Sequence, residues 1–328
     1  MNVLVTGGAG FIGSNLVRCL AASGAEVRVL DDLSTGREEN LSGLNGGVDL
    51  VVGDIRDPKR VASAVRDVEV VYHLAALPSV ARSLADPIAT HEVNAGGTLA
   101  VLMAAREAGA RRLVYASSSS VYGDTPTLPK HEEMPVAPLS PYAASKLAGE
   151  AYARAFARSL GLETVALRFF NVFGPRQDPA SEYAAVIPRF VARLLAGEPP
   201  VVFGDGTQSR DFTYVANVVQ ACVLAGEAGP DASGEAMNVG VGDRTTLVEL
   251  IQLLNDLLGT GIPPSFAEPR PGDVRDSLAD ISKAERLIGY RPLVGVREGL
   301  AQTLEWFARP ADPERPKEPI HTTREEPR

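Results

Sequence analysis

Two side chains in the segment SPYAASK, residues 140–146, have the types and the spacing of an acid–base pair. Tyr142 and Lys146 lie four residues apart, on one face of the helix that the Ser-Pro start predicts. A phenol titrates at about pH 10 and is a poor base at neutral pH. Because a neighbouring ammonium favours the phenolate, we expect a lowered pKa for Tyr142, which would let it take a proton from a hydroxyl group.

A run of four serines, Ser117 to Ser120, follows the apolar strand pattern RRLVYA directly. Serine packs poorly in strands and prefers turns and helix caps, so such a run is unusual at a strand end. The simpler interpretation is a polar exit from the strand. The alternative is that one or two of these hydroxyls contact a substrate.

The N-terminal segment VTGGAGFIG has the glycine spacing of a dinucleotide-binding loop. Gly7, Gly10 and Gly13 separate a short apolar strand from the first helix, where glycine lets phosphate oxygens approach the backbone and the helix N-terminus. The second strand ends in Asp31 and Asp32. A carboxylate at this place accepts hydrogen bonds from the adenosine ribose and repels a 2′-phosphate, so the pattern predicts NAD rather than NADP.

The first half of the chain indicates the fold that would position these groups. Short runs rich in valine and leucine alternate with amphipathic helical patterns, which is typical of a parallel sheet covered on both faces. We therefore predict an α/β protein with a Rossmann-type, doubly wound parallel sheet. The segment GDIRD after the third strand offers Asp54 and Ile55 as partners for adenine.

The texture of the sequence changes after about residue 174, where proline becomes frequent and helices alternate with short irregular strands. We assign residues 1–174 to the NAD-binding domain, with later segments returning to it. Residues 175–309 are assigned to a smaller C-terminal α/β domain that binds the substrate. Residues 310–328 are rich in proline and charge without apolar periodicity, so we expect a flexible tail.

The composition of the 328-residue chain argues against several classes of function. Its formal net charge is −9, and an acidic chain without a basic block is a poor candidate for binding nucleic acid. Two cysteines and four histidines are scattered along it, which argues against a metal site. No apolar run approaches the roughly 18–20 residues needed to cross a membrane, and the N-terminus does not resemble a signal peptide. We expect a cytoplasmic protein without membrane association.

The glycine loop, the serine run and SPYAASK together resemble the extended short-chain dehydrogenases/reductases, and within them the nucleotide-sugar 4-epimerases. The resemblance extends from TGGAGFIG to RPGDVRDSLAD, nearly the whole chain. It implies a tightly held NAD, a UDP-sugar substrate, a catalytic group of Ser118, Tyr142 and Lys146, and a second sugar contact at Ser120. Besides the glycines, acids and catalytic pair, the cofactor contacts that it implies are Phe11, Ile12, Leu74, Ala75, Ala76 and Asn94.

The serine run also separates the reactions found among such enzymes. Relatives that dehydrate the sugar resemble TDEVYG here and use the two acids, whereas this chain has Ser119 and Ser120 at those positions. A hydroxyl near its normal pKa cannot replace a carboxylic acid in that role. Decarboxylating relatives keep a glutamate where Ser120 stands. We therefore predict 4-epimerisation, in which C4 is oxidised to a ketone, the sugar rotates, and the ketone is reduced on its opposite face.

The C-terminal motifs RFFNVFGPRQDPASEYAAVIPRF and FGDGTQSRDFTYV resemble UDP-N-acetylglucosamine 4-epimerases more than glucose-restricted ones. Ser277 stands where the glucose-restricted enzymes carry a bulky tyrosine, and a serine leaves room for an N-acetyl group. The resemblance pairs Arg210 and Arg270 with the diphosphate, since guanidinium groups suit bidentate binding. The substrate contacts expected in full are Ser118, Ser120, Tyr142, Phe170, Asn171, Arg189, Phe203 (uracil), Arg210, Arg270, Asp273 (uridine ribose) and Ser277.

Two alternatives stay open at this point. UDP-glucuronic acid 4-epimerases share the serine run, and Arg176 or Arg189 could reach a sugar carboxylate, although those enzymes usually have threonine where Asn171 stands. A relative that binds NAD as a sensor without turnover would typically have lost the Tyr142–Lys146 pair, which this chain keeps.

The sequence also suggests how two copies would pair. Members of this family commonly form dimers through two helices that pack into a four-helix bundle. The apolar segments at residues 92–109 and 145–160 would suit that contact, so we expect a homodimer.

Overall fold

A computed structural model describes residues 1–44, 46–179, 185–268 and 274–308. Its centre is a seven-stranded sheet with the strand order β11-β6-β5-β4-β1-β2-β3, and each neighbouring pair runs parallel. The predicted doubly wound parallel sheet is thus confirmed. Its strands are β1 (Asn2–Thr6), β2 (Glu26–Asp31), β3 (Val48–Val52), β4 (Val70–His73), β5 (Arg112–Ser118), β6 (Glu163–Phe169) and β11 (Glu235–Val239).

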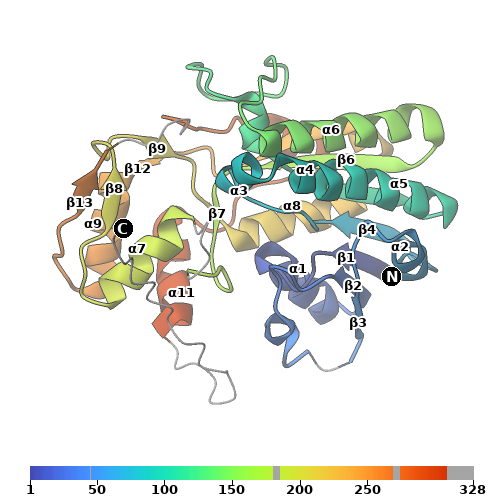
Figure 1. Cartoon of the computed structure of the whole chain (residues 1–328), viewed down its shortest axis with the longest axis horizontal. Coiled ribbons are helices and arrows are strands. Elements are labelled where there is room, and N and C mark those ends of the chain that lie inside the picture. The colour runs from blue at the N-terminus through green and yellow to red at the C-terminus, as the bar shows by residue number, and fades with distance from the viewer. Residues whose placement is uncertain (45, 180–184, 269–273, 309–328) are drawn as a thin grey trace, which may run out of the picture.

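Helices cover both faces of this sheet, as Figure 1 shows. Side chains alternate along each strand, so Val3 and Val5 of β1 belong to one buried core while Leu4 belongs to another. The first core packs beneath α1 (Phe11–Ala22) and α8 (Val215–Glu227), which contact each other. The helices on the other face are α2 (Pro58–Ala64), α5 (Thr98–Glu107) and α6 (Pro141–Ala155).

The C-terminal half of the chain contributes to the central sheet. Strand β11 pairs with β6 from Glu235 opposite Val165 to Val239 opposite Phe169, and so forms one edge of the sheet. Helix α8 precedes β11 in the chain and packs against β5 and β6. Later segments therefore return to the first layer, while the domain boundary at residue 174 stays a prediction.

The other elements of the C-terminal half lie mostly in a second, smaller region (Figure 1). Small two-stranded sheets pair β8 with β13, β9 with β12 and β7 with β10. The elements of the C-terminal half are β7 (Val172–Phe173), α7 (Val186–Leu195), β8 (Val201–Phe203), β9 (Ser209–Arg210), β10 (Thr213–Tyr214), β12 (Thr245–Thr246), α9 (Leu247–Leu258), β13 (Ser265–Ala267), α10 (Ser282–Ile288) and α11 (Val296–Ala308). Two short helices, α3 (Val80–Ala85) and α4 (Pro87–His91), precede α5.

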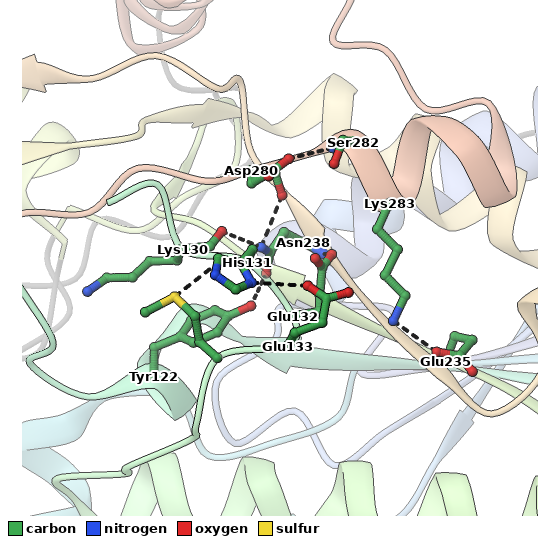
Figure 2. A network of polar contacts seen from close by, with 11 residues as sticks. Tyr122, Lys130, His131, Glu132, Glu133, Glu235, Asn238, Asp280, Ser282 and Lys283 are labelled. Carbon is green, nitrogen blue, oxygen red and sulfur yellow. Dashed lines mark hydrogen bonds and ion pairs between the residues drawn. The ribbon is translucent and has the colours of Figure 1, made fainter. Parts of the chain in front are cut away.

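A polar network ties the loop after the serine run to two later segments (Figure 2). The buried Asn238 amide donates to the carbonyl oxygens of Lys130 (2.8 Å) and Asp280 (3.1 Å), and it accepts the Tyr122 hydroxyl (2.7 Å). The Asn238 N–H donates to the Glu132 carboxylate at 2.7 Å. Because Tyr122 ends the short helix η3 (Ser119–Tyr122), the network fixes the far end of the serine run.

Within the described ranges, no helix combines the length and the apolar character that crossing a membrane requires.

Candidate active site

Two cavities contain most of the side chains singled out from the sequence. The first, of about 230 Å³, lies at the carboxyl ends of the parallel strands, where ligands bind in open α/β sheets. Every predicted cofactor contact except Asn94 lines it: Gly7, Gly10, Phe11, Ile12, Gly13, Asp31, Asp32, Asp54, Ile55, Leu74, Ala75, Ala76, Tyr142 and Lys146. The second cavity, of about 300 Å³, lies in the smaller region and is described below.

The glycine loop between β1 and α1 needs glycine for steric reasons. Gly7 has φ +70°, and a Cβ there would lie 2.7 Å from the Ala75 nitrogen. A Cβ on Gly13 would lie 2.0 Å from the Gly7 carbonyl oxygen. Gly10 caps α1 without a side-chain hydrogen bond, so the first N–H groups of this helix remain available to an anion.

The two aspartates after β2 differ in their surroundings. Asp31 is buried, and its oxygens accept the N–H groups of Ala9 and Leu33, both at 2.9 Å. Burial raises the pKa of Asp31, and the two backbone hydrogen bonds oppose that shift. Asp32 is exposed and accepts the Ser34 N–H and hydroxyl on one oxygen only. Asp31 therefore braces the loop, while Asp32 offers a carboxylate oxygen at the cavity rim.

Asn94 is the predicted cofactor residue that does not line the cavity. Its amide oxygen accepts the Leu77 N–H (2.7 Å), and its nitrogen donates to the Leu77 carbonyl (3.1 Å) and the Ser145 hydroxyl (3.0 Å). Leu77 does line the cavity. Asn94 thus shapes the wall from behind, joining it to helix α6.

Helix α6 brings Tyr142 and Lys146 to the first cavity, as their spacing predicts. Ser140 caps the helix by accepting the Ala143 N–H at 3.1 Å, and Pro141 occupies its first position. The Lys146 ammonium is buried and donates to the Ala116 carbonyl at 2.9 Å. It lies 6.0 Å from the centre of the Tyr142 ring.

The pKa of Tyr142 is shifted in the direction opposite to the prediction. Burial raises the pKa of this phenol, and a hydrogen bond with Ser118 partly offsets the rise. Burial also lowers the pKa of Lys146, to about 8. The prediction considered only the ammonium charge, whereas the protein alone also removes water from both groups.

The four serines have different partners. Ser117 donates to the Glu150 carboxylate behind the strand, and Ser118 accepts the Ser120 N–H at 3.2 Å while also contacting the Tyr142 hydroxyl. The buried Ser120 hydroxyl has no partner among the described residues. Ser118 is thus joined to Tyr142 as predicted, and Ser120 keeps its hydrogen-bonding capacity for a ligand.

The second cavity is lined by four of the predicted substrate residues, Asn171, Arg189, Phe203 and Arg210. The Arg189 guanidinium lies 5.8 Å from the centre of the Phe203 ring. Arg210 donates to the carbonyl oxygens of Ser209 (3.0 Å) and Arg275 (2.6 Å). The cavity thus combines cationic groups with an aromatic ring, a composition that suits a nucleoside diphosphate.

Asn171 joins this cavity to Ser277. It has φ +33°, a left-handed conformation that asparagine tolerates better than most residues. Its amide nitrogen donates to the Asp211 carbonyl (3.1 Å) and to the Ser277 hydroxyl (2.9 Å). The small Ser277 side chain is therefore held directly beside the cavity wall.

Three other predicted substrate residues do not line this wall. The Phe170 side chain is completely buried against Tyr122, with ring centres 6.3 Å apart, and it lines neither cavity. Its position in the motif is correct, but its side chain fills the core. Arg270 and Asp273 lie outside the described residues.

The cavities also contain residues that the sequence did not single out. Gln208, whose amide donates to the Phe203 carbonyl at 2.6 Å, lies within the motif FGDGTQSRDFTYV and could have been found there. The apolar walls carry no comparable signal, because nothing in the sequence distinguishes them from core. The further lining residues include Ser34, Thr35, Ala116 and Phe169 in the first cavity and Phe190, Phe212 and Leu247 in the second. No group of three or more metal-binding side chains occurs in the ranges described.

Comparison with known proteins supports one interpretation of both cavities. Residues 3–240 match the model of the NAD dependent epimerase/dehydratase family. A UDP-glucose 4-epimerase of Mycolicibacterium smegmatis is 44% identical over 311 residues, which cover 94% of this chain and 98% of that protein. Among solved structures, a UDP-N-acetylglucosamine 4-epimerase from Methanobrevibacter ruminantium, in complex with UDP-N-acetylmuramic acid, is 41% identical with a TM-score of 0.89. It covers 93% of this chain and 97% of its own. A UDP-glucose 4-epimerase of Thermus thermophilus in complex with NAD is 40% identical with a TM-score of 0.86, covering 94% and 99%.

Proposed function

The chain belongs to the NAD-dependent epimerase/dehydratase family with NAD as its cofactor, and on this premise we propose that it is a UDP-sugar 4-epimerase. Relatives that it matches over nearly their whole length are 4-epimerases of UDP-glucose and UDP-N-acetylglucosamine. We propose UDP-GlcNAc and UDP-GalNAc as the substrate pair, alongside UDP-Glc and UDP-Gal. The serine run and the small Ser277 side chain support these two parts of the proposal.

The residues around the first cavity fit NAD. Gly7 and Gly13 leave no room for a Cβ where the loop meets the strand ends, and the uncapped start of α1 suits a pyrophosphate. Asp32 has a carboxylate oxygen for ribose hydroxyls, and its charge would repel a 2′-phosphate. Lys146 and Tyr142 stand at the opposite wall.

The proposed reaction uses three side chains at one position. NAD, when bound, supplies the acceptor and then the donor of a hydride at C4 of the sugar. Tyr142 takes the proton of the 4-hydroxyl while C4 becomes a ketone, and it returns that proton when C4 is reduced on the opposite face. Ser118 contacts the Tyr142 hydroxyl and can hydrogen-bond O4, and the buried Lys146 ammonium favours the phenolate.

The observation that carries epimerisation, rather than dehydration, is the absence of acids in the serine run. Ser119 and Ser120 supply hydroxyls only. The carboxylate that contacts the run, Glu150, is bonded to Ser117 and paired with Arg168 at 2.8 Å, behind the strand. A group committed in this way is not placed to protonate a leaving hydroxyl of the sugar.

The direct test is to incubate the purified protein separately with UDP-Glc, UDP-GlcNAc and UDP-GlcA and to follow the appearance of each C4 epimer by chromatography. We expect conversion of the first two sugars. Conversion of UDP-GlcA alone would favour a uronate 4-epimerase, in which Arg189 of the second cavity would meet the carboxylate. A 4-keto-6-deoxy product would show a dehydratase and contradict the proposal.

Replacing Ser277 with tyrosine is expected to separate the two substrate classes. The larger side chain would fill the space beside Asn171 that we assign to the acetamido group, so activity on UDP-GlcNAc should fall by about 100-fold or more, with UDP-Glc activity within about fivefold. Steady-state kinetics on both sugars measures this. Ser277→Ala is the matched control, because it keeps the space and loses only the hydrogen bond. Equal losses on both sugars in Ser277→Tyr would contradict this role.

We also propose that two copies pair through the helices α3 to α6, which contact one another along one side of the molecule (Figure 1). Leu84 is 65% exposed and Ile88 is 71% exposed on this surface, and Met103 and Tyr152 are partly exposed beside them. Apolar side chains gathered on one surface often mark an interface. Light scattering should give twice the chain mass for the wild type and the single mass for Leu84→Asp/Ile88→Asp, whereas a monomeric wild type would exclude the dimer.

A further inference from the structure

The ammonium of Lys146 is buried without a counter-ion. The residue is 4% exposed, and in the part of the chain that the structure describes its printed polar contact is the Ala116 carbonyl at 2.9 Å. Burial is the cause of its lowered pKa, and no nearby carboxylate offsets it. Removing a charge from water without a partner is costly, so another group must stabilise this one.

The Tyr115 ring lies directly under this ammonium. The Lys146 nitrogen is 5.3 Å from the ring centre, within the range of a cation–π interaction, and Tyr115 is 1% exposed. The Tyr115 hydroxyl donates to the Lys146 backbone carbonyl at 3.3 Å. Adjacent residues of β5 therefore serve one lysine, Tyr115 with its ring and Ala116 with its carbonyl oxygen.

Helix α6 is shaped to accept this ring. A Cβ on Gly149 would lie 2.2 Å from the Tyr115 hydroxyl oxygen, so α6 can approach β5 here only because residue 149 has no side chain. On its other side the Tyr115 ring lies 5.8 Å from the ring of His73. Both nitrogens of His73 are hydrogen-bonded, to Thr6 at 2.7 Å and to Thr98 at 2.9 Å, so the support beneath Tyr115 is itself fixed.

The titratable groups around Lys146 leave its positive charge without a full neutralising partner. From β4, His73 is held neutral, because burial and the charge of Lys146 lower its pKa to about 3. From α6, Tyr142 has a raised pKa through burial, and Glu150 is paired with Arg168. A carboxylate beside the ammonium would cancel its field at Tyr142, whereas an aromatic ring stabilises the charge and leaves its net value unchanged.

We propose that Tyr115 is a positioning residue for catalysis, whose ring replaces a counter-ion and keeps Lys146 charged while its field still acts on Tyr142. The role in catalysis rests on the epimerase function proposed above. The stabilisation of Lys146 by the ring does not, so the two can fail independently.

The test measures the ionisation of Lys146 directly. The chain has five lysines, so ¹³C-labelled lysine gives few Cε resonances, and the one lost in Lys146→Arg identifies Lys146. Tyr115→Phe keeps the ring and should leave the midpoint of the Lys146 titration nearly unchanged. Tyr115→Leu removes the ring and should lower it by about one pH unit.

A second series tests the same point without a change of shape. Trifluorophenylalanine at position 115 keeps the size of phenylalanine but weakens the negative face of the ring, so the Lys146 midpoint should fall below that of Tyr115→Phe. The alkaline limb of the pH profile of kcat should move to lower pH by the same amount, because catalysis requires the charged lysine. Thermal melting confirms that each variant is folded.

Equal Lys146 midpoints in the phenylalanine and trifluorophenylalanine proteins would overturn the proposal. A shifted midpoint in a protein that epimerises no UDP-sugar would instead keep the stabilisation by the ring and reject the proposed function.

Discussion

Replacing Tyr142 with phenylalanine is expected to lower kcat for epimerisation by about 10²- to 10⁴-fold while NAD stays bound. The substitution removes one oxygen and keeps the aromatic ring, so the packing near Lys146, whose nitrogen lies 6.0 Å from the ring centre, is preserved. Without the phenol, the group that exchanges a proton with O4 is lost. Ser118, which contacts that phenol, cannot act as the base at neutral pH.

The measurement combines turnover with cofactor content. NAD released on denaturation should match the wild type in Tyr142→Phe, whereas kcat should not. Ser118→Ala is the companion variant, and it should lose less activity, because it removes a hydrogen bond and leaves the base. Wild-type turnover in Tyr142→Phe would overturn the proposed role of the phenol. A wild type that binds NAD and converts none of the three UDP-sugars would instead point to a sensor.

The parts of the site that could be predicted from the sequence are those set by short-range geometry. Tyr142 and Lys146 meet because residues four apart share a helix face, and Gly7 and Gly13 meet because a tight turn joins a strand to a helix. In the same way, the alternation of apolar runs with amphipathic segments was enough to predict the doubly wound sheet.

Long-range packing decided the features that the sequence did not reveal. Phe170 and Asn171 are neighbours in one motif, yet Phe170 fills a core against Tyr122 while Asn171 turns its amide toward Ser277. Asn94 acts through Leu77 rather than on a ligand, which depends on a contact across 17 residues. The direction of the Tyr142 pKa shift depends on burial, a property of the folded site that spacing cannot give.

Loss of the Glu150 carboxylate is the prediction with the largest expected effect on stability. Glu150 lies on the face of α6 that carries Tyr142 and Lys146, and both of its oxygens bind the Arg168 guanidinium, at 2.9 and 2.8 Å. Both side chains are buried, and Arg168 also stacks on the Tyr122 ring at 4.8 Å. Because Glu150→Ala leaves a buried, uncompensated cation, the free energy of unfolding should fall by about 3–5 kcal/mol in urea titrations.

The matched variant is Glu150→Ala/Arg168→Met, which removes both charges and keeps an apolar side chain of similar length in place of Arg168. It should recover much of the loss, because the cost of the single change lies in the unpaired guanidinium rather than in the missing attraction. A double variant as unstable as the sum of its parts would show that the pair acts mainly through packing. Ser117→Ala separates the remaining link, since the Ser117 hydroxyl joins this ion pair to the serine run. It should cost about 1 kcal/mol of stability and lower kcat, because Ser118 is then less firmly held beside Tyr142. An unchanged kcat would mean that the ion pair stabilises the fold without orienting the catalytic serine.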